Sequence, residues 1–237
     1  MRPPGQVSLE RALSKLGLAS RTEARALIAA GRVRVGSEVV LDPRRLVVPE
    51  RAALVIDGQR RTRTSRRLIA FHKPRGVVTT RRDPEGRPTV FDVLGAAADG
   101  LQAVGRLDLA STGLLLLTND TRVAHMLTDP TRAVRRRYVV TVRGRVSEDA
   151  ATALTRGIDV AAPGRGRERL TPAAVIVRKA STRETHLLVT LTEGRNREIR
   201  RMFEALGHEV TRVHRIEFGP IALGTLQPGQ WRDVPWP

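Results

Sequence analysis

The sequence places a short polar loop directly before an apolar run in Gly105-Arg106-Leu107-Asp108-Leu109-Ala110-Ser111-Thr112-Gly113-Leu114-Leu115-Leu116-Leu117-Thr118-Asn119-Asp120. The run from Gly113 to Leu117 is typical of a buried strand. The loop carries one carboxylate, Asp108, between two leucines and two residues after Arg106. A carboxylate among apolar neighbours must find a cation or become neutral, so its presence indicates chemistry. The alternative is a loop aspartate that caps a turn or pairs with Arg106.

Arginine gives the chain an extreme positive charge. Its 237 residues include 42 Lys and Arg against 24 Asp and Glu, a formal net charge of +18, and the sequence pI is near 11.7. The partner expected for such a chain is a polyanion, and planar guanidinium groups suit phosphates and base edges. The length allows one large domain or two modest ones.

Several classes of protein are disfavoured by what the sequence lacks. It contains no cysteine, which excludes disulfides and thiolate metal sites, and its five histidines show no close ligand pairing. We therefore expect no metal. No signal peptide is visible, and no apolar run reaches the ~18 residues of a membrane span. We expect a cytoplasmic monomer that does not enter a membrane.

Residues 8–57 have the pattern of a small domain with two helices and a β-hairpin. Apolar residues at helical spacing predict a helix over 9–16, ended by Gly17. A Ser-x-x-Glu capping box at Ser20 starts the second helix, which Gly31 ends. Two short valine-rich runs around Gly36-Ser37 predict the hairpin. The basic residues of this domain that the predicted core does not use are Lys15, Arg21, Arg25, Arg32 and Arg34.

The rest of the chain divides into a linker and a larger domain. Residues 58–67 contain five arginines and no apolar residue, which predicts a flexible linker. Residues 68–237 alternate strand and helix patterns, as is typical of an α+β domain built on a mixed sheet. We expect strands at 68–72, 76–80, 101–106, 113–118, 136–143, 170–178, 185–192 and 208–218, and helices at 89–95, 120–128, 147–156 and 196–206, the last capped by Asn196.

Tyr138, the only tyrosine of the chain, follows three arginines on a predicted strand. One ring among arginines is typical of a platform on which a base stacks, with a phenol to position a polar edge. The alternative is a tyrosine of the sheet that packs on Val140 and Val142.

Arginines also gather in Glu193-Gly194-Arg195-Asn196-Arg197-Glu198-Ile199-Arg200-Arg201-Met202-Phe203, at the start of the last predicted helix. Cations near a helix N-terminus oppose the macrodipole, so they need an anionic partner. A substrate phosphate or a buried carboxylate would serve, and the alternative is a salt bridge to Glu198 or Glu204.

These segments resemble the motifs of one enzyme family. Four of them carry the resemblance: Lys73-Pro74-Arg75-Gly76, the stretch from Gly105 to Asp120, Arg137-Tyr138, and the stretch from Glu193 to Met202. The chain resembles the ribosomal-RNA pseudouridine synthases of type A, which act on the small subunit, and of types B, E and F, which act on the large subunit. The Asn-Arg-Glu-Ile-Arg-Arg-Met form is closest to type B. The N-terminal domain resembles the alpha-L RNA-binding domain that usually accompanies this family.

The resemblance implies isomerisation of uridine within RNA without a cofactor. It makes Asp108 the catalytic carboxylate, which either attacks the ribose or removes a proton from it. Tyr138 would stack on the uracil and assist proton transfer, and Arg200 would pair with Asp108 and keep it ionised. Arg106 would fill the gap left by the extruded base. The remaining residues implied in RNA binding are Lys73, Arg75, Arg195, Asn196, Arg197 and Ile199, with Arg21, Arg25, Arg32 and Arg34 in the N-terminal domain.

Two other functions fit part of this pattern. A non-catalytic RNA-binding or ribosome-associated protein would explain the charge and the N-terminal domain, but it would not need Asp108, Tyr138 and Arg200. The same chemistry could also act on small-subunit ribosomal RNA or on transfer RNA. We therefore expect an RNA pseudouridine synthase whose substrate is ribosomal RNA, most simply that of the large subunit.

Overall fold

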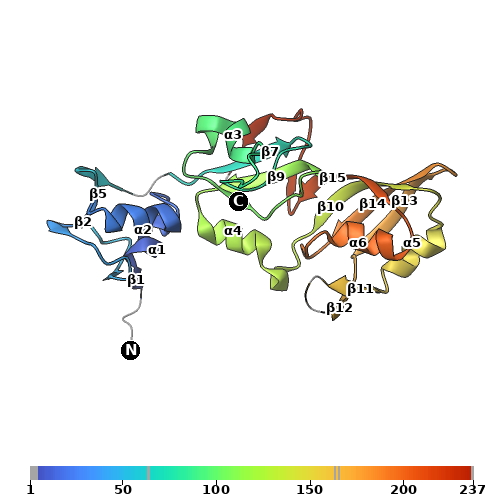
Figure 1. Cartoon of the computed structure of the whole chain (residues 1–237), viewed down its shortest axis with the longest axis horizontal. Helices are drawn as coiled ribbons and strands as arrows, with labels where there is room; N and C mark the ends of the chain where they lie inside the picture. Colours follow the sequence, from blue (N-terminus) through green and yellow to red (C-terminus); the bar gives the residue numbers. More distant parts are fainter. Residues whose placement is uncertain (1–4, 63–64, 163, 165, 236–237) are drawn as a thin grey trace.

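The computed structural model describes residues 5–62, 65–162, 164 and 166–235. The chain forms a small N-terminal domain and a larger domain built on a mixed sheet (Figure 1). This arrangement confirms the α+β class predicted from the sequence. Within the described ranges, no helix is both long enough and apolar enough to cross a membrane.

The N-terminal domain packs two helices against short strands. Its helices are α1 (Leu9–Lys15) and α2 (Arg21–Ala29), and its strands are β1 (Val7–Ser8), β2 (Val33–Val35), β3 (Glu38–Val39), β4 (Leu46–Val47), β5 (Leu54–Ile56) and β6 (Gln59–Arg61). Four strands form a sheet in the order β3-β2-β5-β6, and β1 pairs with β4. The predicted capping box is confirmed, because the Glu23 amide donates to Ser20 Oγ at 3.2 Å and the Ser20 amide donates to Glu23 Oε2 at 2.8 Å.

The arginines of the N-terminal domain are not a free basic set. Arg21 and Arg25 both pair with Glu10, a buried carboxylate, and hydrogen bonds from Arg25 and then Arg21 lower the pKa of Glu10 to about 2. Arg32 forms two hydrogen bonds with Asp57, at 2.6 and 2.7 Å. The sequence pattern did not show these pairs because the carboxylates come from distant positions of the chain.

Part of the predicted linker belongs to the N-terminal sheet. Residues Gln59–Arg61 form β6, which pairs antiparallel with β5. All three residues of β6 are exposed, so a strand at the edge of the sheet needs no apolar residue to form here. Residues 63 and 64 of the predicted linker lie outside the described ranges.

The larger domain contains a nine-stranded sheet and several short helices. The helices are α3 (Val90–Leu94), η1 (Gly95–Ala98), α4 (Thr121–Thr128), η2 (Pro130–Arg132), α5 (Glu148–Leu154) and α6 (Glu198–Ala205). The strands are β7 (Leu68–Lys73), β8 (Gln102–Val104), β9 (Thr112–Thr118), β10 (Arg136–Arg143), β11 (Ile158–Ala162), β12 (Gly166–Leu170), β13 (Ala174–Ala180), β14 (Glu184–Leu191), β15 (Val210–Phe218), β16 (Ile221–Ala222) and β17 (Trp231–Asp233).

The strand order of the large sheet is β13-β14-β10-β15-β9-β7-β17, with β8 paired to β9 and β16 paired to β15. The pairing of β9 with β15 is parallel, whereas the other described pairs in this sheet are antiparallel. Leu115 and Leu117 of β9 belong to one core cluster, and Leu114 and Leu116 belong to another. Since both faces of β9 are covered, its sequence is continuously apolar rather than alternating.

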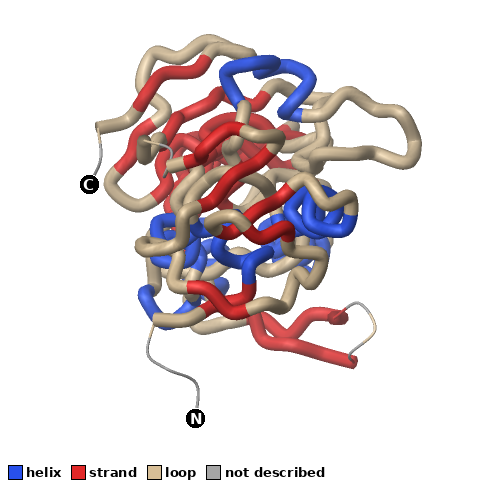
Figure 2. The backbone as a smooth tube through the Cα atoms, turned by 90° about the vertical axis from the view of Figure 1, so that its left-hand side faces the viewer, coloured by secondary structure: helices blue, strands red, loops and turns tan. Residues whose placement is uncertain are grey.

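Three predicted elements differ from the structure, and one pair of strands was not predicted. Residues 76–80 form a loop with a single bridge from Val78 to Thr89. The strand expected at 170–178 is divided between β12 and β13, with Pro172 in the gap. The β11–β12 pair, which the sequence pattern did not predict, projects from the rest of the protein (Figure 2). The last helix begins at Glu198, and Arg197 rather than Asn196 is its N-cap, in a left-handed conformation (φ 47°).

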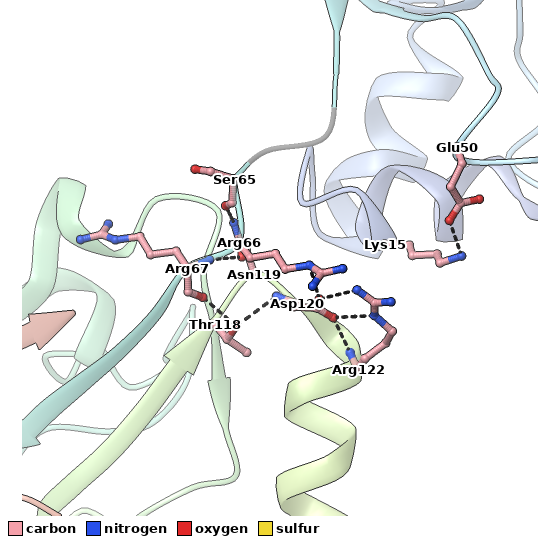
Figure 3. A network of polar contacts seen from close by, with 9 residues as sticks. All are labelled: Lys15, Glu50, Ser65, Arg66, Arg67, Thr118, Asn119, Asp120 and Arg122. Carbon is pink, nitrogen blue, oxygen red and sulfur yellow. Dashed lines mark hydrogen bonds and ion pairs between the residues drawn. The ribbon is translucent and has the colours of Figure 1, made fainter. Parts of the chain in front are cut away.

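Polar contacts fasten the segment that enters the larger domain (Figure 3). Asp120 caps α4 by accepting from the Arg122 amide at 2.8 Å, and its carboxylate lies 3.3 Å from Nε of Arg66. Asn119 accepts from the Arg67 amide at 2.8 Å and donates to the Ser65 carbonyl at 2.7 Å. The chain entering β7 is therefore held against the end of β9.

Gly113 provides a test of the sheet. A side chain at Gly113 would place its Cβ against the Arg215 carbonyl and 2.7 Å from the Arg215 nitrogen, and φ is +101°. We expect Gly113→Ala to lower the free energy of unfolding by more than about 4 kcal/mol, because both the contact and the backbone conformation exclude a Cβ. The measurement is chemical denaturation.

The matched control is Gly86→Ala. Gly86 also has positive φ (+70°), but no heavy atom lies within 4 Å of an added Cβ. The control should cost about 1–2 kcal/mol, which is the effect of the left-handed conformation alone. Equal losses in the two variants would contradict a close approach of β9 and β15.

Candidate active site

A cavity of about 480 Å³ opens beside the start of β9. Its wall includes Asp108 from the loop between β8 and β9, Tyr138 from β10 and Arg200 from α6. The cavity therefore brings together the three residues that the motifs predict to be catalytic, although they are far apart in the sequence.

The loop that carries Asp108 is supported by the segment after β7. The Gly76 amide donates to the Leu109 carbonyl at 2.9 Å, and the Thr79 hydroxyl donates to the Leu107 carbonyl at 2.9 Å. Gly76 and Thr79 thus bond to this loop and Val78 to Pro88, instead of to a neighbouring strand, so the predicted strand does not form. Asp108 itself is half-buried, and among the described residues no cation lies within 4.0 Å of its carboxylate.

Lys73 is a supporting residue and is not exposed to solvent. Its exposed fraction is 0%, and Nζ donates to the Ser111 carbonyl at 2.8 Å and to the Pro74 carbonyl at 3.0 Å. Burial lowers the pKa of Lys73 to about 8, and the charge of Asp108 opposes this shift. The ammonium of Lys73 is enclosed beneath the Asp108 loop, so the predicted contact of Lys73 with RNA stays a prediction that this structure does not support.

Tyr138 both packs in the sheet and faces the cavity, as its two alternative interpretations require. It lies in one buried cluster with Val140 and Val142, two and four residues along β10, and it also lines the cavity. Its neighbours across the sheet are Val189 on β14 and Arg215 on β15. The strand therefore fixes the ring while leaving part of it facing the cavity.

Arg200 reaches the cavity from the first turn of α6. Its Nη1 donates to the Val210 carbonyl at 2.6 Å, whereas Nε and Nη2 are buried without a partner in the described part of the chain. Burial and the nearby Arg197 lower the pKa of Arg200, and the charge of Asp108 raises it. The ion pair expected between Arg200 and Asp108 is absent at 4.0 Å, since the Val210 carbonyl holds the guanidinium, but two N–H groups remain available.

The other predicted RNA-binding residues divide between the cavity and the surface. Those that line the cavity are Arg106, Arg195, Arg197 and Ile199, whereas Arg75 and Asn196 are exposed and lie outside it. Arg195 and Arg201 both pair with Glu168 on β12, and Arg197 lies 3.9 Å from Glu204. Carboxylates of the protein itself thus supply part of the negative charge that the start of α6 requires.

Four further charged residues line the cavity without having been predicted: Arg136, Glu193, Glu198 and Arg215. Arg136, Arg215 and Glu198 are buried, with exposed fractions of 6%, 2% and 3%. The guanidinium groups of Arg136 and Arg215 lie 4.7 and 4.9 Å from the ring of Phe218. The only sequence signal for Arg215 is its alternation with Val213 and Val210 on β15, which is too weak to separate it from other arginines.

Two family models match this chain. The S4 domain model matches residues 8–51, and the RNA pseudouridylate synthase model matches residues 67–205, more than half of the chain. The chain belongs to the RNA pseudouridylate synthase family. The family and the enzyme class predicted from the motifs are thereby confirmed.

Known proteins resemble the whole chain and not only one domain. The ribosomal large subunit pseudouridine synthases B of Salmonella typhi and of Escherichia coli (strain K12) are each 39% identical over 236 residues, covering 95% of this chain and 78% of theirs. A crystal structure of a pseudouridylate synthase superposes with a TM-score of 0.68 at 27% identity and covers 96% of both chains. The two-domain arrangement is therefore shared with these relatives.

The different surroundings of Lys73 and Arg75 give a paired test. Lys73→Met should lower kcat by up to about 100-fold, because the Asp108 loop loses the hydrogen bond from Lys73 to the Ser111 carbonyl, while the Kd for RNA stays unchanged. Arg75→Met, at an exposed position, should instead weaken RNA binding and reduce its salt slope by about 1. Filter binding at several salt concentrations and single-turnover kinetics measure both. A Kd that rises for Lys73→Met with unchanged kcat would show that Lys73 binds RNA.

Proposed function

We propose that this enzyme converts specific uridines of large-subunit ribosomal RNA to pseudouridine, with Asp108 as the catalytic carboxylate. The observation that carries the proposal is the position of Asp108: it lies half-buried in the cavity wall, without an ion-pair partner among the described residues, together with Tyr138 and Arg200. The choice of the large subunit is supported by the ribosomal large subunit pseudouridine synthases B, which are 39% identical over nearly the whole chain.

The reaction is an isomerisation, so the nucleotide neither gains nor loses atoms overall. The bond between N1 of uracil and C1′ of ribose breaks, the base turns, and a bond between C5 and C1′ forms, while one proton leaves C5 and one is gained at N1. Asp108 acts at the ribose, either as a nucleophile at C1′ or as a base. No described residue forms an ion pair with Asp108, so its carboxylate oxygens remain free to contact the ribose in either role.

Tyr138 and Arg200 position the base and the carboxylate. The ring of Tyr138 is rigid because it is packed in the core of the sheet, so it offers a fixed surface on which uracil stacks. The unpartnered N–H groups of Arg200 can donate to Asp108 or to the substrate once RNA fills the cavity. Arg106, exposed at the cavity edge, is placed to occupy the gap left by the extruded base.

The RNA target is tested by mapping pseudouridines. In a strain that lacks this gene, we expect one or a few pseudouridines to disappear from large-subunit ribosomal RNA, and to return with the wild-type gene. Loss confined to small-subunit ribosomal RNA or transfer RNA would keep the chemistry and contradict the substrate.

The role of Asp108 is tested by Asp108→Asn, which preserves size but removes the charge. We expect release of tritium from RNA labelled at C5 of uridine to fall by at least about 1,000-fold, with the melting temperature and RNA affinity nearly unchanged. Asp99→Asn, at an exposed position of the same domain, is the matched control and should retain full activity. Substantial release by Asp108→Asn would contradict the assignment.

The hydroxyl of Tyr138 is tested separately from its ring. Tyr138→Phe keeps the stacking surface, so RNA affinity should persist, whereas loss of a proton-transfer group should slow turnover by about 100-fold or more. Tyr138→Ala should in addition lose about 1–3 kcal/mol of binding free energy from stacking. A phenylalanine variant with wild-type turnover would limit Tyr138 to stacking.

A further inference from the structure

Glu198 is a buried carboxyl group in the cavity wall that the reaction outlined above does not use. It is the first residue of α6, only 3% of it is exposed, and it lines the same cavity as Asp108 and Tyr138. A carboxylate buried to this extent without a cation in contact is energetically costly. Its protonation state and its contacts therefore need an explanation.

The two oxygens of Glu198 have different surroundings. Oε2 accepts a hydrogen bond from the Arg195 amide at 3.0 Å, whereas Oε1 is buried with no donor from the described residues. Glu193 is close enough for its negative charge to disfavour ionisation of Glu198. Burial above all, and then the charge of Glu193, raise the pKa of Glu198 to about 7.

The other charges around Glu198 do not neutralise it by direct contact. Arg195 directs its side chain to Glu193 and Glu168 through Nε and Nη1, each at 2.7 Å. Arg136 on β10 is near enough for its pKa to respond to both glutamates, but its N–H groups donate to backbone carbonyls. Arg215 on β15 lines the same cavity and donates to the Leu114 carbonyl. Protonation removes the cost of burying a negative charge here, and it makes Glu198 a donor that has no acceptor at Oε1 among the described residues.

We propose that Glu198 is held in its protonated form beside Glu193 and donates a hydrogen bond from Oε1 to a carbonyl oxygen of the uracil of the target uridine. The inference rests on the proposed function and adds a substrate-binding residue to it. A neutral carboxyl supplies a donor through one oxygen while the other keeps its bond to the Arg195 amide. Uracil presents two carbonyl oxygens as acceptors, and an ionised carboxylate would repel them.

The test compares Glu198→Gln with the wild type over a range of pH. Glutamine is neutral at every pH, its carbonyl can still accept from the Arg195 amide, and its NH₂ group replaces the donor O–H. Glu204→Gln is the matched control, because Glu204 is an exposed residue on the same helix. The readout is single-turnover release of tritium from RNA labelled at C5 of uridine, with enzyme in excess, across the range from mildly acidic to mildly alkaline pH.

We expect the wild-type rate to fall as pH rises through about 7, reaching a loss of about 30-fold at about pH 8.5, where a group with this pKa is about 3% protonated. Glu198→Gln should lack this fall and exceed the wild type at the alkaline end of the range, and Glu204→Gln should follow the wild type. Glu198→Met, which fills the space without a donor, should be slow at every pH while its circular dichroism spectrum remains native.

Other outcomes would overturn the inference. If Glu198 only fastens the loop through the Arg195 amide, carboxylate and amide serve equally, and the wild type and Glu198→Gln will have the same pH profile. A wild-type rate that does not fall near neutral pH, or full activity of Glu198→Met, would also contradict it. Tritium release by the wild type at mildly acidic pH tests the proposed function independently, and its absence at every pH would refute that function as well.

Discussion

The parallel contact between β9 and β15 determines where the functional residues lie. Thr112 and Gly113 of β9 pair with His214 and Arg215 of β15, and this pairing joins strands β7 and β9 to strands β10, β14 and β13 in one sheet. The Asp108 loop enters β9 at this point, and Tyr138 is the neighbour of Arg215 on the other side of β15. Glycine at 113 allows the two backbones to approach. The position of the Asp108 loop relative to Tyr138 therefore depends on this backbone pairing.

Buried cations in the cavity wall bond to backbone carbonyls instead of carboxylates. Arg136 donates to the carbonyls of Leu127, Val134 and Thr192, and Arg215 donates to that of Leu114. A carbonyl orients a guanidinium but does not cancel its charge, so the wall remains positive where a polyanion would enter. Such fixed charges need no reorganisation when the substrate binds, which is the property expected of electrostatic stabilisation in a catalytic site.

Local sequence patterns predicted the elements but not the contacts between distant segments. The capping box at Ser20 and the buried strand from Gly113 were recognisable because their signals lie within a few residues. The loop at 76–80 was mistaken for a strand, since its polar groups bond to residues 107–109, which no local pattern shows. For the same reason the burial of Lys73 and the proximity of Glu193 to Glu198 emerge only in three dimensions. The motifs identified the family and thereby brought Asp108, Tyr138 and Arg200 together before any geometry was known.

The arginine pairs of the N-terminal domain are compatible with the RNA contacts proposed for them. Arg25, Arg32 and Arg34 each use Nε and Nη2 in the hydrogen bonds that hold them, to Glu10, Asp57 and the Ser37 carbonyl. A guanidinium carries five N–H groups in a rigid fork, so the edge at Nη1 stays available for a phosphate oxygen. Because these hydrogen bonds already hold each arginine side chain in place, the side chain loses less conformational entropy when RNA binds. The carboxylates of Glu10 and Asp57 also cancel part of the positive charge of their arginines. The salt dependence of RNA binding should therefore reflect the phosphates that are contacted rather than the number of arginines in this domain.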